Sequence, residues 1–183
     1  MLLKILVAVV ILLLVLVVLI TMRPDTFRTT RSATIAAPPA VVFEQVNDLH
    51  KWEAWSPWAK LDPAAKQTYE GPASGKGAAF SWAGNSKVGE GKMAITESRP
   101  NEYVRFQLDF LKPFKSSNIA EFSFKPEGNQ TVVSWSMSGP CNFMSKAVGL
   151  FINCDKMIGG DFERGLAQMK AIAEANAQKQ PQS

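Results

Sequence analysis

An unbroken apolar run near the N-terminus constrains this chain more than any other feature. Sixteen consecutive residues at positions 5–20 are apolar, and the next two extend the run to eighteen. An α-helix of eighteen residues is about 27 Å long, and the hydrocarbon core of a bilayer is about 30 Å thick. The run therefore predicts a transmembrane anchor over residues 1–22, followed by a short polar linker over residues 23–26.

A cleaved signal peptide is the alternative for this segment. Its apolar stretch would be about 7–15 residues long and would end at a small-x-small cleavage site. Here the run is longer, and the chain leaves it through Ile-Thr-Met-Arg-Pro at positions 20–24. We therefore expect an uncleaved, single-pass membrane anchor. The side on which the rest of the chain lies stays open, because Lys4 precedes the run and three arginines follow it, partly offset by Asp25.

Composition limits what the rest of the chain can be. Eleven Phe and five Trp exclude a disordered chain, and two Cys exclude a small scaffold built on disulfides. A net charge of +4 without a basic stripe gives no reason to expect a nucleic-acid partner. The part of the chain after the linker is long enough for one domain with a full hydrophobic core. We place that domain at residues 27–176, with a polar tail at residues 177–183.

Alternation of apolar and polar residues predicts a series of antiparallel strands. In residues 103–110 every second residue is apolar, from Val104 to Phe110, and the residues between them are polar. Similar segments, separated by Gly and Pro, predict further strands at residues 27–36, 67–70, 77–83, 89–98, 118–125 and 130–138. Such alternation is typical of a sheet with one face in water. A short amphipathic helix is predicted at residues 39–48.

The last predicted element is a long amphipathic helix. From Phe143 to Ala173 apolar residues recur at steps of three and four, and Gly159-Gly160 in the middle suggests a bend. The apolar face of the sheet needs a cover, and only this helix is long enough to provide it. We therefore predict an α+β domain in which a curved antiparallel β-sheet wraps around a long C-terminal helix, plus one N-terminal transmembrane helix.

Several short motifs resemble those of a known superfamily. The most specific is Asn-Asp-Leu-His-Lys-Trp-Glu-Ala-Trp-Ser-Pro-Trp at positions 47–58, and weaker matches lie at positions 32–38, 69–72, 75–78, 82–85, 89–93 and 162–166. Over about residues 27–174 the chain resembles the START-like (SRPBCC, helix-grip) superfamily, in particular its bacterial polyketide cyclase/dehydrase-like branch. The resemblance implies a helix-grip fold with a cavity between sheet and long helix, which other members use for lipids, sterols, polyketides or hormones. The bacterial branch also implies that the anchor lies in a bacterial inner membrane.

A set of large aromatic residues is our candidate for the wall of that cavity. The set comprises Trp58, Phe80, Trp82, Phe106, Phe122 and Trp135. Large rings give an apolar ligand contact area and indole N–H groups can orient it, although the same residues also suit an ordinary core. A Trp-rich edge formed by Trp55 and Trp58, between Lys51 and Lys60, could instead rest at a membrane interface.

The sequence offers little for catalysis. His50 is the single histidine and the two cysteines lack ligand spacing, so we expect no metal site. No nucleophile elbow, phosphate loop or dinucleotide fingerprint is present, so we expect no cofactor. An acid–base reaction needs only one carboxylate or tyrosine in an apolar pocket, and catalytic residues stay unassigned. The polar candidates are Tyr69, Glu70, Glu90, Tyr103, Arg105 and Asp109, of which the alternation places the last three on the wet face.

Three functions stay open. A membrane-anchored domain that binds a lipid or another apolar small molecule fits the combination of anchor and cavity best. The alternatives are a polyketide cyclase/dehydrase-type enzyme that uses acid–base residues in the cavity, and a structural or assembly partner in the membrane without a ligand. Cys141 and Cys154 could form a disulfide or remain buried thiols.

Overall fold

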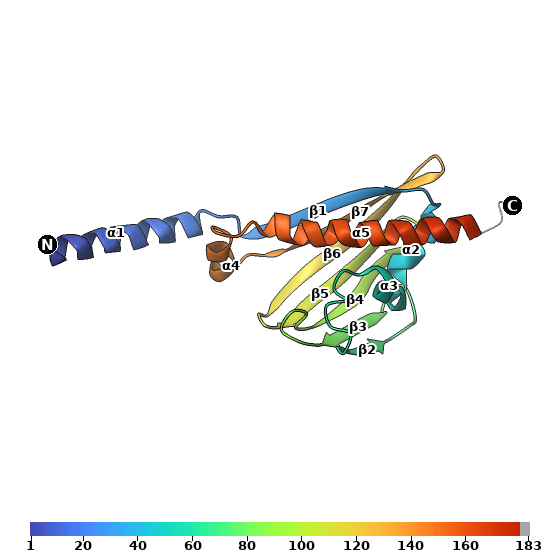
Figure 1. Cartoon of the computed structure of the whole chain (residues 1–183), viewed down its shortest axis with the longest axis horizontal. Coiled ribbons are helices and arrows are strands. Elements are labelled where there is room, and N and C mark those ends of the chain that lie inside the picture. The colour runs from blue at the N-terminus through green and yellow to red at the C-terminus, as the bar shows by residue number, and fades with distance from the viewer. Residues whose placement is uncertain (180–183) are drawn as a thin grey trace.

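Seven antiparallel strands form one curved sheet in the computed structural model, which describes residues 1–179 (Figure 1). The strands are β1 (Thr26–Ile35), β2 (Lys66–Glu70), β3 (Ala79–Ala83), β4 (Glu90–Arg99), β5 (Tyr103–Lys112), β6 (Ser116–Glu127) and β7 (Gln130–Pro140). Their order is β1-β7-β6-β5-β4-β3-β2, so β2 to β7 form a meander and β1 pairs with β7 at one edge.

Some of the helices pack on one side of this sheet, and others lie beyond one of its ends. They are α1 (Leu2–Thr21), α2 (Pro39–Asn47), the 3-10 turn η1 (Leu49–Lys51), α3 (Trp52–Trp55), α4 (Phe143–Val148) and α5 (Cys154–Lys179). The long helix α5 packs against the sheet along β1, while α2 and α3 cover the end of the sheet farthest from α1 (Figure 1). This arrangement confirms the predicted α+β fold, in which an antiparallel sheet packs on a long C-terminal helix.

The alternation in the sequence explains which face of the sheet is covered. In β5, Val104 and Phe106 are completely buried on the concave face, whereas Tyr103 and Arg105 are half-buried on the convex face. The pairing of β4 with β5 shifts register between Ile95 and Glu97. A β-bulge of this kind bends and twists a strand. The sheet can therefore curve around α5 while each strand keeps its two-residue period.

The predicted C-terminal helix is interrupted near its start. A continuous helix from Phe143 was wrong, because α4 ends at Val148 and α5 begins only at Cys154. The side chain of Asn142 accepts a hydrogen bond from the backbone of Ser145 at 2.8 Å and caps α4. Asn153 accepts one from the backbone N–H of Lys156 at 2.9 Å and starts α5 in the same way. Two N-caps eleven residues apart thus divide one amphipathic pattern into two helices.

Gly159 marks the place where β1 and α5 are joined. A Cβ atom there would lie 2.0 Å from a guanidinium nitrogen of Arg31, which crosses α5 at this point. Arg31 bonds Asp155 at 3.0 Å and Glu163 at 2.7 Å, and the bond from Arg31 lowers the pKa of Asp155. Instead of the suggested bend, α5 runs through Gly159-Gly160 without interruption and continues to Lys179. The predicted tail at 177–183 is therefore helical up to residue 179, and its last four residues lie outside the described part.

Gly165 lies against the aromatic core, and Gly160 of the same helix does not. A Cβ atom at Gly165 would lie 2.8 Å from Cζ3 of Trp135, while one at Gly160 would meet nothing within 4 Å. Both alanine substitutions gain roughly 0.5–1 kcal/mol of helix propensity. Only Gly165→Ala also overpacks the core, so we expect it to be about 1–3 kcal/mol less stable than Gly160→Ala in urea unfolding. Equal stabilities would show that Trp135 has room to move.

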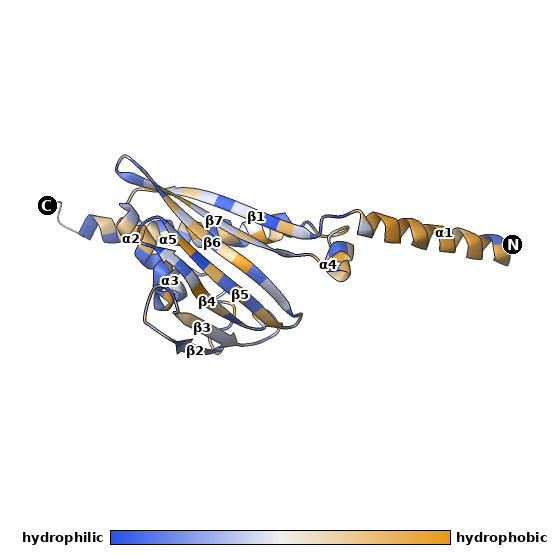
Figure 2. Ribbon diagram, turned by 180° about the vertical axis from the view of Figure 1, so that it is seen from behind, coloured by the Kyte–Doolittle hydropathy of each residue, from blue (hydrophilic) through white to orange (hydrophobic). Residues whose placement is uncertain are grey.

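The N-terminal helix α1 extends away from the domain (Figure 1). Its apolar side chains are exposed along its length except at Leu16 and Ile20, and Figure 2 shows it as hydrophobic over most of its length, apart from a hydrophilic band near the N-terminus. It is long and apolar enough to cross a bilayer, and a signal sequence would share both properties.

Cys141 and Cys154 are free thiols, and burial raises the pKa of Cys141.

Candidate functional site

A cavity of about 370 Å³ lies between the concave face of the sheet and α5. That volume is within the usual range of small-molecule sites, about 300–1,000 Å³. Apolar side chains from the sheet and α5 form most of the wall, among them Phe80, Met93, Leu108, Met137 and Ile158. The segment from α3 to Ala65 closes another side. The sheet, α5 and the segment from α3 to Ala65 therefore all contribute to the cavity wall.

Four of the six predicted wall residues line this cavity: Trp58, Phe80, Trp82 and Trp135. The other two, Phe106 and Phe122, are completely buried and lie behind the wall. Their rings pack edge-on against Trp52 at centroid distances of 5.3 and 5.8 Å. Strand alternation places the five of these residues that lie in strands on the concave face, but it carries no information on depth below the surface of the cavity. Trp58 lies outside the strands, in the segment after α3.

Trp135 is the centre of the aromatic core behind the cavity. Its ring stacks on Phe162 of α5 at 4.0 Å with an interplanar angle of 9°, and on Phe122 at 4.8 Å with an angle of 26°. Trp55 and Trp58 meet it edge-on at 5.6 and 5.9 Å. One indole therefore joins β7, α5 and the segment between α2 and β2. The same indole is also part of the cavity wall.

The segment that carries Trp52 and Trp55 is held by hydrogen bonds to the end of α2. The indole N–H groups of Trp52 and Trp55 donate to the carbonyls of Val46 at 2.9 Å and Gln45 at 3.0 Å. The suggested membrane-interface role was wrong for Trp55, which is completely buried, because its indole satisfies a carbonyl inside the domain. Trp58 is half-buried and faces the cavity instead.

Trp82 is held in the wall by two features of its neighbours. Its indole N–H donates to the carbonyl of Val88 at 3.0 Å, which ties the β3–β4 turn to the wall. The ring lies over Gly91, where a Cβ atom would come within 2.4 Å of it. Phe80 stacks on it at 5.9 Å and Phe110 meets it edge-on at 5.9 Å. Phe110 was absent from our candidates. It lies on the same face of β5 as Phe106, so the alternation in the sequence could have identified it.

Three carboxylates lie among the lining residues, and none of those residues is Lys, Arg or His. Glu53 is exposed, Asp62 accepts backbone N–H bonds from Ala64 at 3.2 Å and Asn85 at 2.7 Å, and Asp161 pairs with Arg164. An anionic ligand group beside one of these carboxylates would meet negative charge, and the wall has no cationic side chain to offset it. The polar part of the wall therefore suits a neutral or cationic group.

Of the acid–base candidates, only Tyr69 lines the cavity. Burial, followed by the charges of Glu53 and Asp48, raises the pKa of its phenol. It therefore stays protonated at neutral pH and donates to Gln67 at 3.2 Å. His50 is exposed and stacks on the Tyr69 ring at a centroid distance of 4.1 Å.

The remaining candidates lie outside the cavity. Tyr103, Arg105 and Asp109 alternate with the buried residues of β5 and lie on the convex face, as the alternation predicted. Burial and a hydrogen bond to Glu121 raise the pKa of Tyr103 to about 12, and the same bond lowers the pKa of Glu121. Two further carboxylates pair across strands, Glu70 with Lys92 at 2.8 Å and Glu90 with Lys112 at 2.7 Å.

Comparison with known proteins gives a family match and a set of structural neighbours. Residues 26–174 match the family model described as polyketide cyclase/dehydrase and lipid transport. No curated protein matches the chain. Among solved structures, protein CV1439 from Chromobacterium violaceum is 17% identical with a TM-score of 0.57, and the match covers 83% of this chain and 99% of that one.

Two further neighbours have similar values. The protein Mll3558 from Rhizobium loti is 15% identical with a TM-score of 0.59, and the match covers 80% of this chain and 96% of that one. The Aha1 dimer from Colwellia psychrerythraea is 18% identical with a TM-score of 0.55, over 81% of this chain and 96% of that one. At such identities these likenesses show the shared fold alone.

Proposed function

Because this chain belongs to the polyketide cyclase/dehydrase and lipid transport family, we propose that its domain holds a lipid or another apolar small molecule between the sheet and α5. The cavity itself is the observation that carries the proposal, since aromatic and aliphatic side chains form most of its wall. Burying about 300 Å² of apolar ligand surface contributes roughly 7 kcal/mol. After the cost of immobilising the ligand, that corresponds to micromolar-class affinity at best.

The three carboxylates in the cavity wall predict which ligand ends are accepted. Two fluorescent probes of equal chain length, one ending in an alcohol and one in a carboxylate, should differ in affinity at neutral pH. We expect the alcohol to bind about tenfold more tightly, a difference of ~1.4 kcal/mol, because Glu53, Asp62 and Asp161 repel the anion.

The matched control is Glu53→Gln, which removes the one of these charges that has neither a salt-bridge partner nor a hydrogen-bond donor among the described residues. It should narrow the difference between the two probes without changing the affinity for the alcohol. Tighter binding of the carboxylate would contradict the assignment, and binding of neither probe would contradict the proposed function itself.

We further propose that α1 spans a membrane and holds the domain at its surface. The support is a helix of 20 residues whose apolar side chains are exposed on all sides, a surface that water disfavours and lipid accepts. The alternative, a signal sequence, would be removed from the mature protein.

Intact-mass analysis of protein extracted from cells separates the anchor from a signal sequence. We expect residues 1–22 to be retained and the protein to stay in the membrane fraction after an alkaline carbonate wash. A variant that lacks residues 1–22 should be soluble and folded, because the core elements begin at Thr26 and it keeps Asp25, which pairs with Lys146. A mature N-terminus beyond Ile20 would refute the anchor.

A further inference from the structure

The exposed apolar side chains outside the N-terminal helix are gathered in two segments. In the described part of the domain after Met22, ten large apolar side chains are exposed, and eight of them lie at 111–114 or 143–157. The most exposed are Phe114 at 79% and Phe151 at 81%. Apolar surface of this extent marks an interaction site, because isolated exposed residues rather than clusters are the norm.

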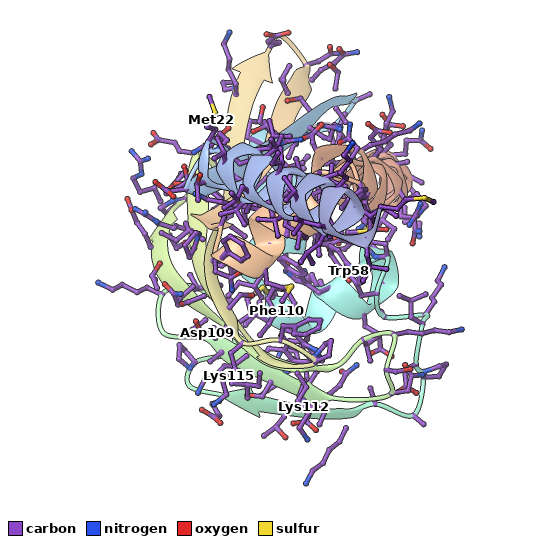
Figure 3. The ribbon with its side chains drawn as sticks, turned by 90° about the vertical axis from the view of Figure 1, so that its left-hand side faces the viewer. Met22, Trp58, Asp109, Phe110, Lys112 and Lys115 are labelled. Carbon is purple, nitrogen blue, oxygen red and sulfur yellow. The ribbon has the colours of Figure 1, made fainter. Side chains whose placement is uncertain are left out.

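Both segments lie at the end of the domain from which α1 leaves. Thr26 at the start of β1 pairs with Pro140 at the end of β7, and the β5–β6 hairpin, at residues 112–116, lies at the same end of the sheet. Figure 3 looks onto this end and shows Met22 together with Lys112 and Lys115 of the hairpin. We call it the anchor-side end, defined by residues 111–115 and 143–157.

Contacts fix α4 beside the exit of α1. The two helices pack together, and Ile20 is the one buried residue of α1. Asp25, just after α1, pairs with Lys146 of α4 and accepts the backbone N–H of Cys141 at 2.7 Å. If α1 crosses a bilayer, α4 and its exposed side chains are therefore held at the surface of that bilayer.

Charges at the anchor-side end suit a lipid surface. Lys115 in the hairpin and Lys156 in the first turn of α5 have no salt-bridge partner within residues 1–179. The same holds for Lys87 in the β3–β4 turn, which adjoins the anchor-side end because Glu90 pairs with Lys112. Apolar side chains combined with unpaired lysines are typical of segments that lie in a membrane interface, where the ammonium groups reach the head groups. Continuity with α1 makes a bilayer, rather than another protein, the partner that this surface meets first.

The cavity reaches the same end. Met157 is exposed at the anchor-side end and also lines the cavity, and Phe110 in the wall directly precedes exposed Leu111. We propose that the anchor-side end inserts shallowly into the bilayer, so that an apolar ligand passes between lipid and cavity without crossing water. This inference rests on the proposed function, since it needs both an anchor and a ligand.

Site-specific labelling of the full chain tests the inserted surface. The protein, with Cys141→Ser and Cys154→Ser, is placed in vesicles of phosphatidylcholine with a minor fraction of phosphatidylglycerol and labelled with an environment-sensitive dye at Phe151→Cys or Asn129→Cys. Asn129 lies in the β6–β7 turn at the opposite end of the sheet. We expect a quencher carried by the lipid to act at position 151 and aqueous iodide to act at position 129. Equal iodide quenching at both positions in protein that floats with the vesicles would overturn the docking.

A transfer measurement tests the route of the ligand. The variant Phe114→Asp/Phe151→Asp changes two exposed side chains and should slow the uptake of a vesicle-borne fluorescent alcohol by about tenfold, because two charges oppose insertion. Its affinity for a short-chain, water-soluble probe should not change. The control Ser123→Asp/Asn129→Asp adds the same charge away from this end and should transfer at the wild-type rate. Equal transfer by both variants would refute the route, whereas absence of probe binding in the wild type would refute the proposed function.

Discussion

Replacing Trp135 with alanine should lower the free energy of unfolding by about 3–5 kcal/mol, the largest loss that we expect from a single substitution in this domain. The indole stacks on Phe162 at 4.0 Å and on Phe122 at 4.8 Å, and it is 2% exposed. Alanine would remove these contacts and leave a void between β7 and α5. Urea unfolding measures the loss, with Trp135→Ala compared with the parent protein, both without residues 1–22 and both monitored by circular dichroism.

Two matched variants identify the cause of that loss. Trp135→Phe keeps a ring in the stack and removes an indole N–H that has no hydrogen-bond partner within the described residues, so its cost should be clearly smaller than that of alanine. Phe114→Ala removes a ring that is 79% exposed and should change stability by less than about 0.5 kcal/mol. A loss below about 1 kcal/mol for Trp135→Ala would contradict the core position of Trp135.

Filling the cavity should abolish ligand uptake without unfolding the domain. Ala120 of β6 lines the cavity and is small, so Ala120→Phe directs a ring into the space that we assign to the ligand. We expect at least a tenfold loss of affinity for a fluorescent alcohol probe, which corresponds to ~1.4 kcal/mol or more. Stability should fall little, because the added ring enters empty space rather than a packed core.

The control for the cavity variant is Ser123→Phe. Ser123 is in the same strand but on the exposed convex face, so this variant adds the same side chain where no ligand is expected. It should bind the probe with wild-type affinity. If Ala120→Phe and Ser123→Phe bind the probe equally well, the probe is held somewhere other than the cavity.

The sequence predicted the sheet well because strand alternation reports directly on burial. Every second residue is apolar over residues 104–110 of β5 and residues 133–137 of β7, and the structure covers this face, with Val104, Phe106 and Val133 completely buried. The apolar face that this period creates needs a cover, and the long C-terminal helix is the only predicted element long enough to provide it. Fold class and strand positions thus follow from local patterns alone.

The break in the C-terminal helix and the depth of the aromatic residues depend on details that such patterns do not carry. The cap at Asn153 separates α4 from α5, although the apolar spacing continues across the break. Phe106 and Phe122 share a face with Trp135 but lie behind the cavity wall, because Trp52 packs over them from another part of the chain. Tyr69 joins the wall from the edge strand β2, where every residue is exposed and burial left no signal in the sequence.

Native mass spectrometry of the full chain released from its membrane tests the proposed ligand cavity most directly. Wild type and Ser123→Phe should each carry one apolar small molecule per chain more than Ala120→Phe. The comparison separates a molecule in the cavity from lipid bound along α1, which all three proteins would retain equally. The same adduct in all three proteins, or no adduct in any, would contradict the assignment of the cavity as a ligand site.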